Sequence, residues 1–84
     1  MNITVIKEPL VGLSSQDVVC EYARLKLEIH IDENISPHLQ RNLVIHSVIE
    51  NYCRSWTHDK VEQLEELIID GLDQLESNNA IKAA

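Results

Sequence analysis

The segment from Arg24 to Asp32 alternates strictly between polar and apolar side chains, and this pattern limits the fold more than any other in the chain. Its apolar members are Leu25, Leu27, Ile29 and Ile31. A period of two places these side chains on one face of a β-strand and the polar ones on the other face. The pattern therefore predicts a strand in a sheet that is covered on one side only, as in antiparallel sheets packed against helices.

A helix with a clearly marked start follows this strand. Ser36 suits the N-cap position, and Pro37 suits the first helical position, where its missing N–H costs no hydrogen bond. Apolar side chains then recur over a wide arc as far as Cys53, which predicts a largely buried helix. His46 and Glu50 are four residues apart within it, so they project from the same face, one turn apart.

A second helix is expected after Thr57, which can cap its N-terminus. The expected inward stripe of this helix consists of Val61, Leu64, Ile68, Leu72 and Leu75. Gly71 lies within the helix and indicates either close packing or a weak point. We expect a single domain over residues 1–78 and a flexible C-terminal tail over residues 79–84.

The N-terminal part is expected to add strands to the same sheet. Asn2–Lys7 is short and rich in β-branched residues. Val18–Glu21 is compatible with a further strand after a loop over residues 10–17, and a helical turn over residues 17–23 is the alternative. The predicted fold class is therefore α+β: two or three short antiparallel strands with two helices packed on one face. A chain of 84 residues buries only a modest core, so self-association would help to stabilise it.

The net charge of −7 is concentrated in residues 57–79, which hold seven acidic residues against the single Lys60. A surface of this kind argues against direct binding to nucleic acid, which needs a basic footprint. It favours a basic protein partner, although a merely solvated helix face is the alternative. The residues predicted to bind protein are Glu62, Glu65, Glu66, Leu67, Ile69, Asp70 and Asp73.

The lack of a recognisable targeting segment and the use of cysteine both indicate the cytoplasm. No apolar run approaches the roughly 18 residues of a membrane span, so no membrane contact is expected. Residues 1–7 lack the basic start and apolar core of a signal peptide. Cys20 and Cys53 fall in different expected elements and are predicted to be buried free thiols.

The segment His46-Ser47-Val48-Ile49-Glu50 is related in spacing to the zincin motif HExxH. In that motif two histidines bind zinc, and the glutamate beside the first acts as general base. The flanking elements have a matching order, in the segments Val19–Tyr22, Leu27–Asp32, Ile35–His46 and Val61–Leu75 with Asn78. Over roughly residues 18–78 the chain thus resembles the small metallopeptidase-like proteins of phages and prophages, which are related to the ImmA type of zincin.

This resemblance implies metal ligands at His46, at Glu50, and at His58 or Asp59. It places the general base at Ser47, which cannot act as a base at neutral pH. We therefore expect a small non-catalytic protein of phage type, without a cofactor, in the cytoplasm of a bacterial host. It would act by binding another protein, for example by inhibiting a host factor.

Other functions stay open from the sequence. One is a metal-dependent hydrolase with altered ligands, which would hold zinc, and another is an acidic mimic that blocks the groove of a nucleic-acid-binding protein. His46 is equally compatible with a core or interface histidine that is hydrogen-bonded to a neighbour, with Glu50 at the surface near Arg54. A homodimer formed through Leu67 and Ile69 is also compatible with the pattern.

Overall fold

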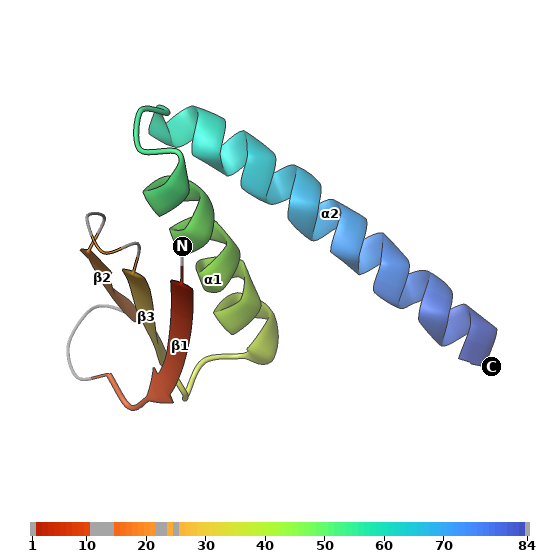
Figure 1. The fold of residues 1–84 in the computed structure, drawn as a ribbon. Coiled ribbons are helices and arrows are strands. Elements are labelled where there is room, and N and C mark those ends of the chain that lie inside the picture. Colours follow the sequence, from red (N-terminus) through yellow and green to blue (C-terminus); the bar gives the residue numbers. More distant parts are fainter. Residues whose placement is uncertain (1, 11–14, 22–23, 25, 84) are drawn as a thin grey trace.

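A computed structural model describes residues 2–10, 15–21, 24 and 26–83, with side chains as far as residue 78. These residues form three strands and two helices: β1 (Asn2–Glu8), β2 (Gln16–Glu21), β3 (Lys26–Asp32), α1 (Pro37–Tyr52) and α2 (His58–Ala83) (Figure 1). The predicted α+β class is confirmed. Residues 11–14 of the expected loop, and Leu25, lie outside the described residues.

The described strands make one mixed sheet in the order β1-β3-β2. As expected, β2 runs antiparallel to β3, with Val18 opposite Ile29. In contrast, β1 runs parallel to β3, with Val5 opposite Ile29. An alternating pattern determines which side chains share a face but not the direction of the neighbouring strand, so the sequence did not reveal the parallel pair.

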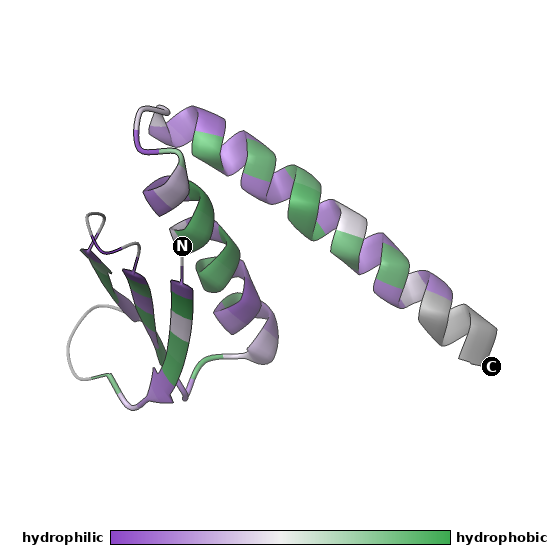
Figure 2. Ribbon diagram, in the orientation of Figure 1, coloured by the Kyte–Doolittle hydropathy of each residue, from purple (hydrophilic) through white to green (hydrophobic). Residues whose placement is uncertain are grey.

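The core lies between the sheet and α1. Leu27, Ile29 and Ile31 are at most 1% exposed, as their alternation predicted, and half-buried Val44 and Val48 of α1 pack against them. Figure 2 shows the alternation as bands of opposite hydropathy along the strands. The polar residues of β3 lie on the opposite face, which α1 leaves uncovered.

The start of α1 is held as its sequence predicted. The Ser36 hydroxyl accepts a hydrogen bond from the Leu39 N–H at 3.2 Å, and Pro37 occupies the first turn. The buried Gln40 side chain donates to the Asp32 carbonyl oxygen at 3.1 Å. This bond joins the first turn of α1 to the end of β3, so the helix is docked directly onto the central strand.

The second helix packs on α1, so α1 is the middle layer between the sheet and α2 (Figure 1). The Thr57 hydroxyl accepts the Lys60 N–H at 3.3 Å and caps α2 as predicted. The expected inward stripe is covered only in part, since Val61 is 2% exposed whereas Ile68 and Leu75 are 36% and 55% exposed. The reason is that α2 diverges from α1, and its C-terminal end lies well away from the sheet (Figure 1).

Three smaller predictions can also be compared with the structure. A Cβ atom built on Gly71 would meet nothing within 4 Å, so close packing does not explain this glycine. The α2 backbone is helical through Ala83, whereas the flexibility expected of residues 79–84 stays a prediction. Cys20 and Cys53 are free thiols, and both are half-buried rather than fully buried.

Candidate functional site

Two histidines and three glutamates gather where α1 meets the first turns of α2. His46 and Glu50 come from α1, and His58, Glu62 and Glu65 come from α2. The rings of His46 and His58 approach edge to face, with 5.4 Å between their centroids. We refer to these five residues as the His–Glu cluster.

His46 is held by a carboxylate at each ring nitrogen. Its Nδ1 lies 2.7 Å from Glu65 Oε2, and its Nε2 lies 2.9 Å from Glu50 Oε2. Burial lowers the pKa of His46, but the hydrogen bonds and negative charges of Glu65 and Glu50 outweigh burial, and the pKa is raised above its ordinary value. The arrangement therefore favours a doubly protonated imidazolium that donates to both carboxylates.

The remaining predicted ligands lie nearer to solvent. His58 Nε2 contacts Glu62 Oε1 at 2.8 Å, and both of these side chains are at least half exposed. Asp59, in the first turn of α2, is exposed as well. The structure thus brings together His46, Glu50 and His58 from the predicted metal set, and Asp59 directly follows His58 in the sequence.

The present side-chain positions suit hydrogen bonding better than coordination. Glu50 and Glu65 bind opposite nitrogens of His46, whereas a metal ion would take one nitrogen and gather its other ligands around it. Metal binding by His46, Glu50 and His58 stays a prediction.

Elsewhere in the described part of the chain, His38, Asp73 and Glu76 place donor atoms within 4.8 Å of one another. All three are exposed, and Arg41 already binds both carboxylates. Its guanidinium donates to Asp73 Oδ1 at 2.8 Å and to Glu76 Oε1 at 2.9 Å. This cation connects the N-terminal half of α1 with the C-terminal half of α2.

Ser47, the residue at which the resemblance would place the general base, faces the sheet. It is 1% exposed, and its hydroxyl donates to Gln16 Oε1 of β2 at 2.8 Å. The side chain therefore bridges α1 and β2 and does not join the His–Glu cluster. The sequence did not reveal this role, because Gln16 is 31 residues away.

Glu65 differs from the other acidic residues of α2. Its side chain is only 17% exposed and is paired with His46, although the sequence placed it among the protein-binding residues. Its spacing in the sequence could have indicated this burial, because Glu65 lies four residues after the buried Val61, on the same side of the helix.

The other predicted protein-binding residues form an exposed strip that we call the acidic face of α2. It consists of Glu62, Glu66, Leu67, Asp70 and Asp73. Leu67 is 70% exposed, and together with Gln63, Glu66 and Asp70 it lines a shallow cavity of about 500 Å³. Ile69 is half-buried and does not belong to this strip.

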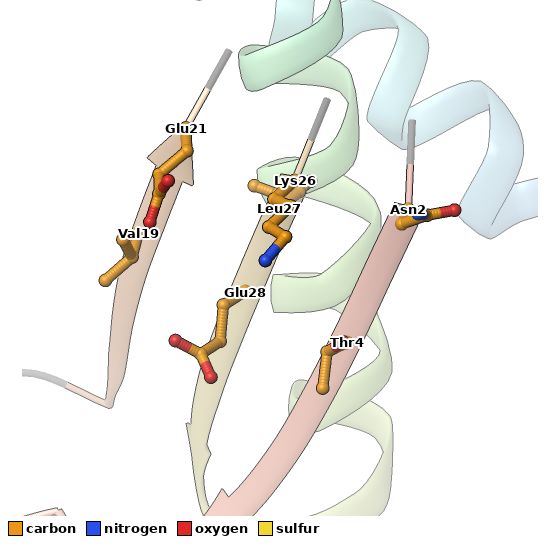
Figure 3. Close-up of a pocket in the computed structure, with 7 residues that line it drawn as sticks. All are labelled: Asn2, Thr4, Val19, Glu21, Lys26, Leu27 and Glu28. Carbon is orange, nitrogen blue, oxygen red and sulfur yellow. The ribbon is translucent and has the colours of Figure 1, made fainter. Parts of the chain in front are cut away.

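The uncovered face of the sheet carries a second hollow, of about 370 Å³ (Figure 3). In this view α1 lies behind the strands, and the labelled residues come from all three of them: Asn2, Thr4, Val19, Glu21, Lys26, Leu27 and Glu28. His30 lies on the same face. Its Nδ1 is 2.6 Å from Glu8 Oε1 of β1, and its Nε2 is 3.4 Å from Glu28 Oε2. The hydrogen bonds to Glu8 and then Glu28 raise the pKa of His30.

Comparison of the chain with models of known protein families, with curated proteins and with solved structures finds no match. The metallopeptidase resemblance therefore stays a prediction. In the part of the chain that the structure describes, neither helix combines the length and the apolar character that crossing a lipid bilayer requires.

Proposed function

We propose that this chain is a non-catalytic protein that binds a basic protein partner through the acidic face of α2. The observation that carries the proposal is Leu67, which is 70% exposed and lines one shallow cavity together with Glu66 and Asp70. An exposed apolar anchor beside charged side chains is typical of binding surfaces, where the anchor contributes affinity and the charges contribute specificity and association rate. In the form that the phage resemblance implies, the partner is a host factor in the bacterial cytoplasm, and binding inhibits it.

The chemistry of the partner follows from this surface. A complementary site would hold Leu67 in a small apolar recess with lysine or arginine side chains at its rim. The carboxylates would steer the two proteins together, and the association rate would fall as salt screens their charges.

The His–Glu cluster supports a structural role for the residues that the zincin motif would use for chemistry. His46 of α1 contacts Glu65 of α2, and Ser47 bridges α1 to β2. Ser47 therefore helps to hold α1 on the sheet, and His46 helps to hold α2, which presents the acidic face, against α1.

Binding is tested with the immobilised chain and a lysate of candidate host bacteria, followed by titration of each purified binder. The test variant combines Glu66→Lys, Leu67→Ser and Asp70→Lys. The control combines Asp17→Lys and Glu33→Lys, which make the same change of charge at exposed positions outside α2. We expect the test variant to lose binding and the control to keep it.

Binding that survives the test variant, or that both variants lose equally, would contradict the proposal. The same purified binder distinguishes an acidic mimic from other partners: if the chain occupies a nucleic-acid groove, duplex DNA competes with it. A binder that DNA does not displace excludes the mimic.

A metal-dependent hydrolase with altered ligands is the second candidate, because His46, Glu50 and His58 do lie together. It predicts stoichiometric zinc in protein purified without chelator, and loss of that zinc in His46→Ala. His30→Ala is the matched control, since His30 lies in β3, outside both the His–Glu cluster and the group of His38, Asp73 and Glu76. Zinc that depends on His46 would overturn the non-catalytic proposal, whereas metal-free wild-type protein would exclude the hydrolase.

A further inference from the structure

The outer edge of β1 has backbone groups that the described sheet does not use. The Glu8 carbonyl oxygen accepts the Glu33 N–H at 3.0 Å, so the backbone of Glu8 faces β3. Because backbone groups alternate in direction along a strand, the N–H and C=O groups of Ile3, Val5 and Lys7 point away from β3. This edge can therefore accept another strand.

The side chains of this edge are apolar and exposed. Ile3 and Val5 are opposite Leu27 and Ile29 in the register, on the side of the sheet that α1 covers, yet they are 48% and 46% exposed. Beside them a groove of about 300 Å³ separates β1 from α1, and its lining includes Val5, Lys7, Ile31, Pro37 and Val44. An edge strand with exposed β-branched side chains is a ready template for strand pairing.

The opposite edge of the sheet is protected. On β2, Asp17 and Glu21 flank Val19, and all three are exposed. Charged side chains of this kind prevent edge-to-edge pairing. Residues 2–6 of β1, in contrast, carry no charged side chain.

We propose that a second copy of this chain pairs with this edge, β1 antiparallel to β1, about a twofold axis at Val5. In this register Val5 is opposite Val5 of the second copy, and Ile3 is opposite Lys7. Each of these residues has its N–H and C=O on the outer edge, so every such pair exchanges two hydrogen bonds. The two sheets then become continuous, with both α1 helices on the same side.

The sequence of the edge favours a second copy over an unrelated strand. Ile3, Val5 and Lys7, whose backbone groups lie on the outer edge, complement the same three residues of a second copy. In this register the aliphatic stem of each Lys7 covers Ile3 of the other copy, and the two lysines are not opposite each other. The described part of the chain has only five buried apolar side chains: Leu27, Ile29, Ile31, Ile49 and Val61. Covering Ile3 and Val5 in both copies would enlarge a small core.

The test is the molar mass of the full chain, measured by light scattering across a dilution series from high micromolar concentration. We expect the wild-type mass to approach twice the 9.6 kDa of one chain at high concentration. Val5→Lys places two positive charges opposite each other at the axis and is expected to give the monomer mass. Val19→Lys is the matched control, because Val19 is a similarly exposed valine (45%) in the other edge strand, and it is expected to stay dimeric.

Val5→Pro separates backbone pairing from a side-chain effect. It removes an N–H that points outward, so the bond pattern of β1 with β3 is kept and the folded monomer is expected, with an unchanged circular dichroism spectrum. A monomeric wild type, a dimeric Val5→Lys or a dimeric folded Val5→Pro would each overturn the proposal. Loss of the dimer in Leu67→Lys with retention in Val5→Lys would instead place self-association on α2.

Discussion

Among the described side chains, His46 of α1 and Glu65 of α2 form the shortest polar contact between the two helices, with His46 Nδ1 2.7 Å from Glu65 Oε2. Both side chains are largely buried, and Glu50 holds the other ring nitrogen. This contact lies at the end of the helix pair where Val61 is also buried. It therefore helps to hold the first turns of α2, the helix that presents the acidic face, against α1.

We expect the contact between His46 and Glu65 to make stability depend on pH. The pKa of His46 is raised in the folded state, so the folded protein binds a proton more tightly than the unfolded chain. Its stabilising contribution is fully present below the unfolded pKa of about 6.5 and is lost as pH rises through the folded pKa. The free energy of unfolding, measured in urea, should fall over this range.

The control for this prediction uses the histidine variants. His46→Asn should flatten the decrease, because Glu50 and Glu65 then face no titrating ring at that position, although His58 stays nearby. The pKa of His30 is raised as well, so His30 also makes the free energy of unfolding fall as pH rises. His30→Asn should therefore remove only its own share of this decrease and leave the share that depends on His46. A slope that is unchanged in His46→Asn would contradict the prediction.

Arg41 is expected to hold the C-terminal half of α2 against α1. Its guanidinium binds Asp73 and Glu76, whose side chains are more than half exposed. Arg41→Gln should speed amide hydrogen exchange over residues 70–78, and added salt should do the same in the wild type by screening the charges. Exchange over residues 58–64 serves as the internal control and should change little, because that region is anchored by Val61 and His46.

Gly71→Ala is expected to stabilise α2. A Cβ atom at Gly71 would meet nothing within 4 Å, so alanine brings its higher helix propensity without a clash. The gain is about 1 kcal/mol in an exposed helix interior. Hydrogen exchange over residues 66–76 and thermal unfolding would measure it. Slower exchange with a higher melting temperature supports the prediction, and a lower melting temperature would contradict it.

Ile29→Ala is expected to destabilise the whole domain. Ile29 is 0% exposed at the centre of β3, between the other two strands and under α1. Removing such a side chain costs about 2–5 kcal/mol, a large part of the roughly 5–15 kcal/mol of a typical domain. Val19→Ala, on the exposed face of β2, should shift the urea midpoint far less. Equal shifts in the two variants would argue against the assigned core.

The sequence by itself determined the elements and much of their burial. Strict alternation identified β3 and its buried face, the Ser36-Pro37 pair identified the start of α1, and Thr57 identified the start of α2. These are local signals, because they depend on backbone geometry and on side chains within one turn or one pleat. The α+β class followed from their order.

The tertiary structure decided what depends on distant partners. Nothing local specifies that β1 lies parallel to β3, because that direction follows from the path of the chain through β2. Glu65 pairs with His46, 19 residues away, and Ser47 pairs with Gln16, 31 residues away. Sequence spacing could therefore assign each residue to a face of its element but could not identify its partner. The divergence of α2 from α1 also depends on tertiary contacts, and it leaves Ile68 and Leu75, two of the five residues of the apolar stripe, exposed.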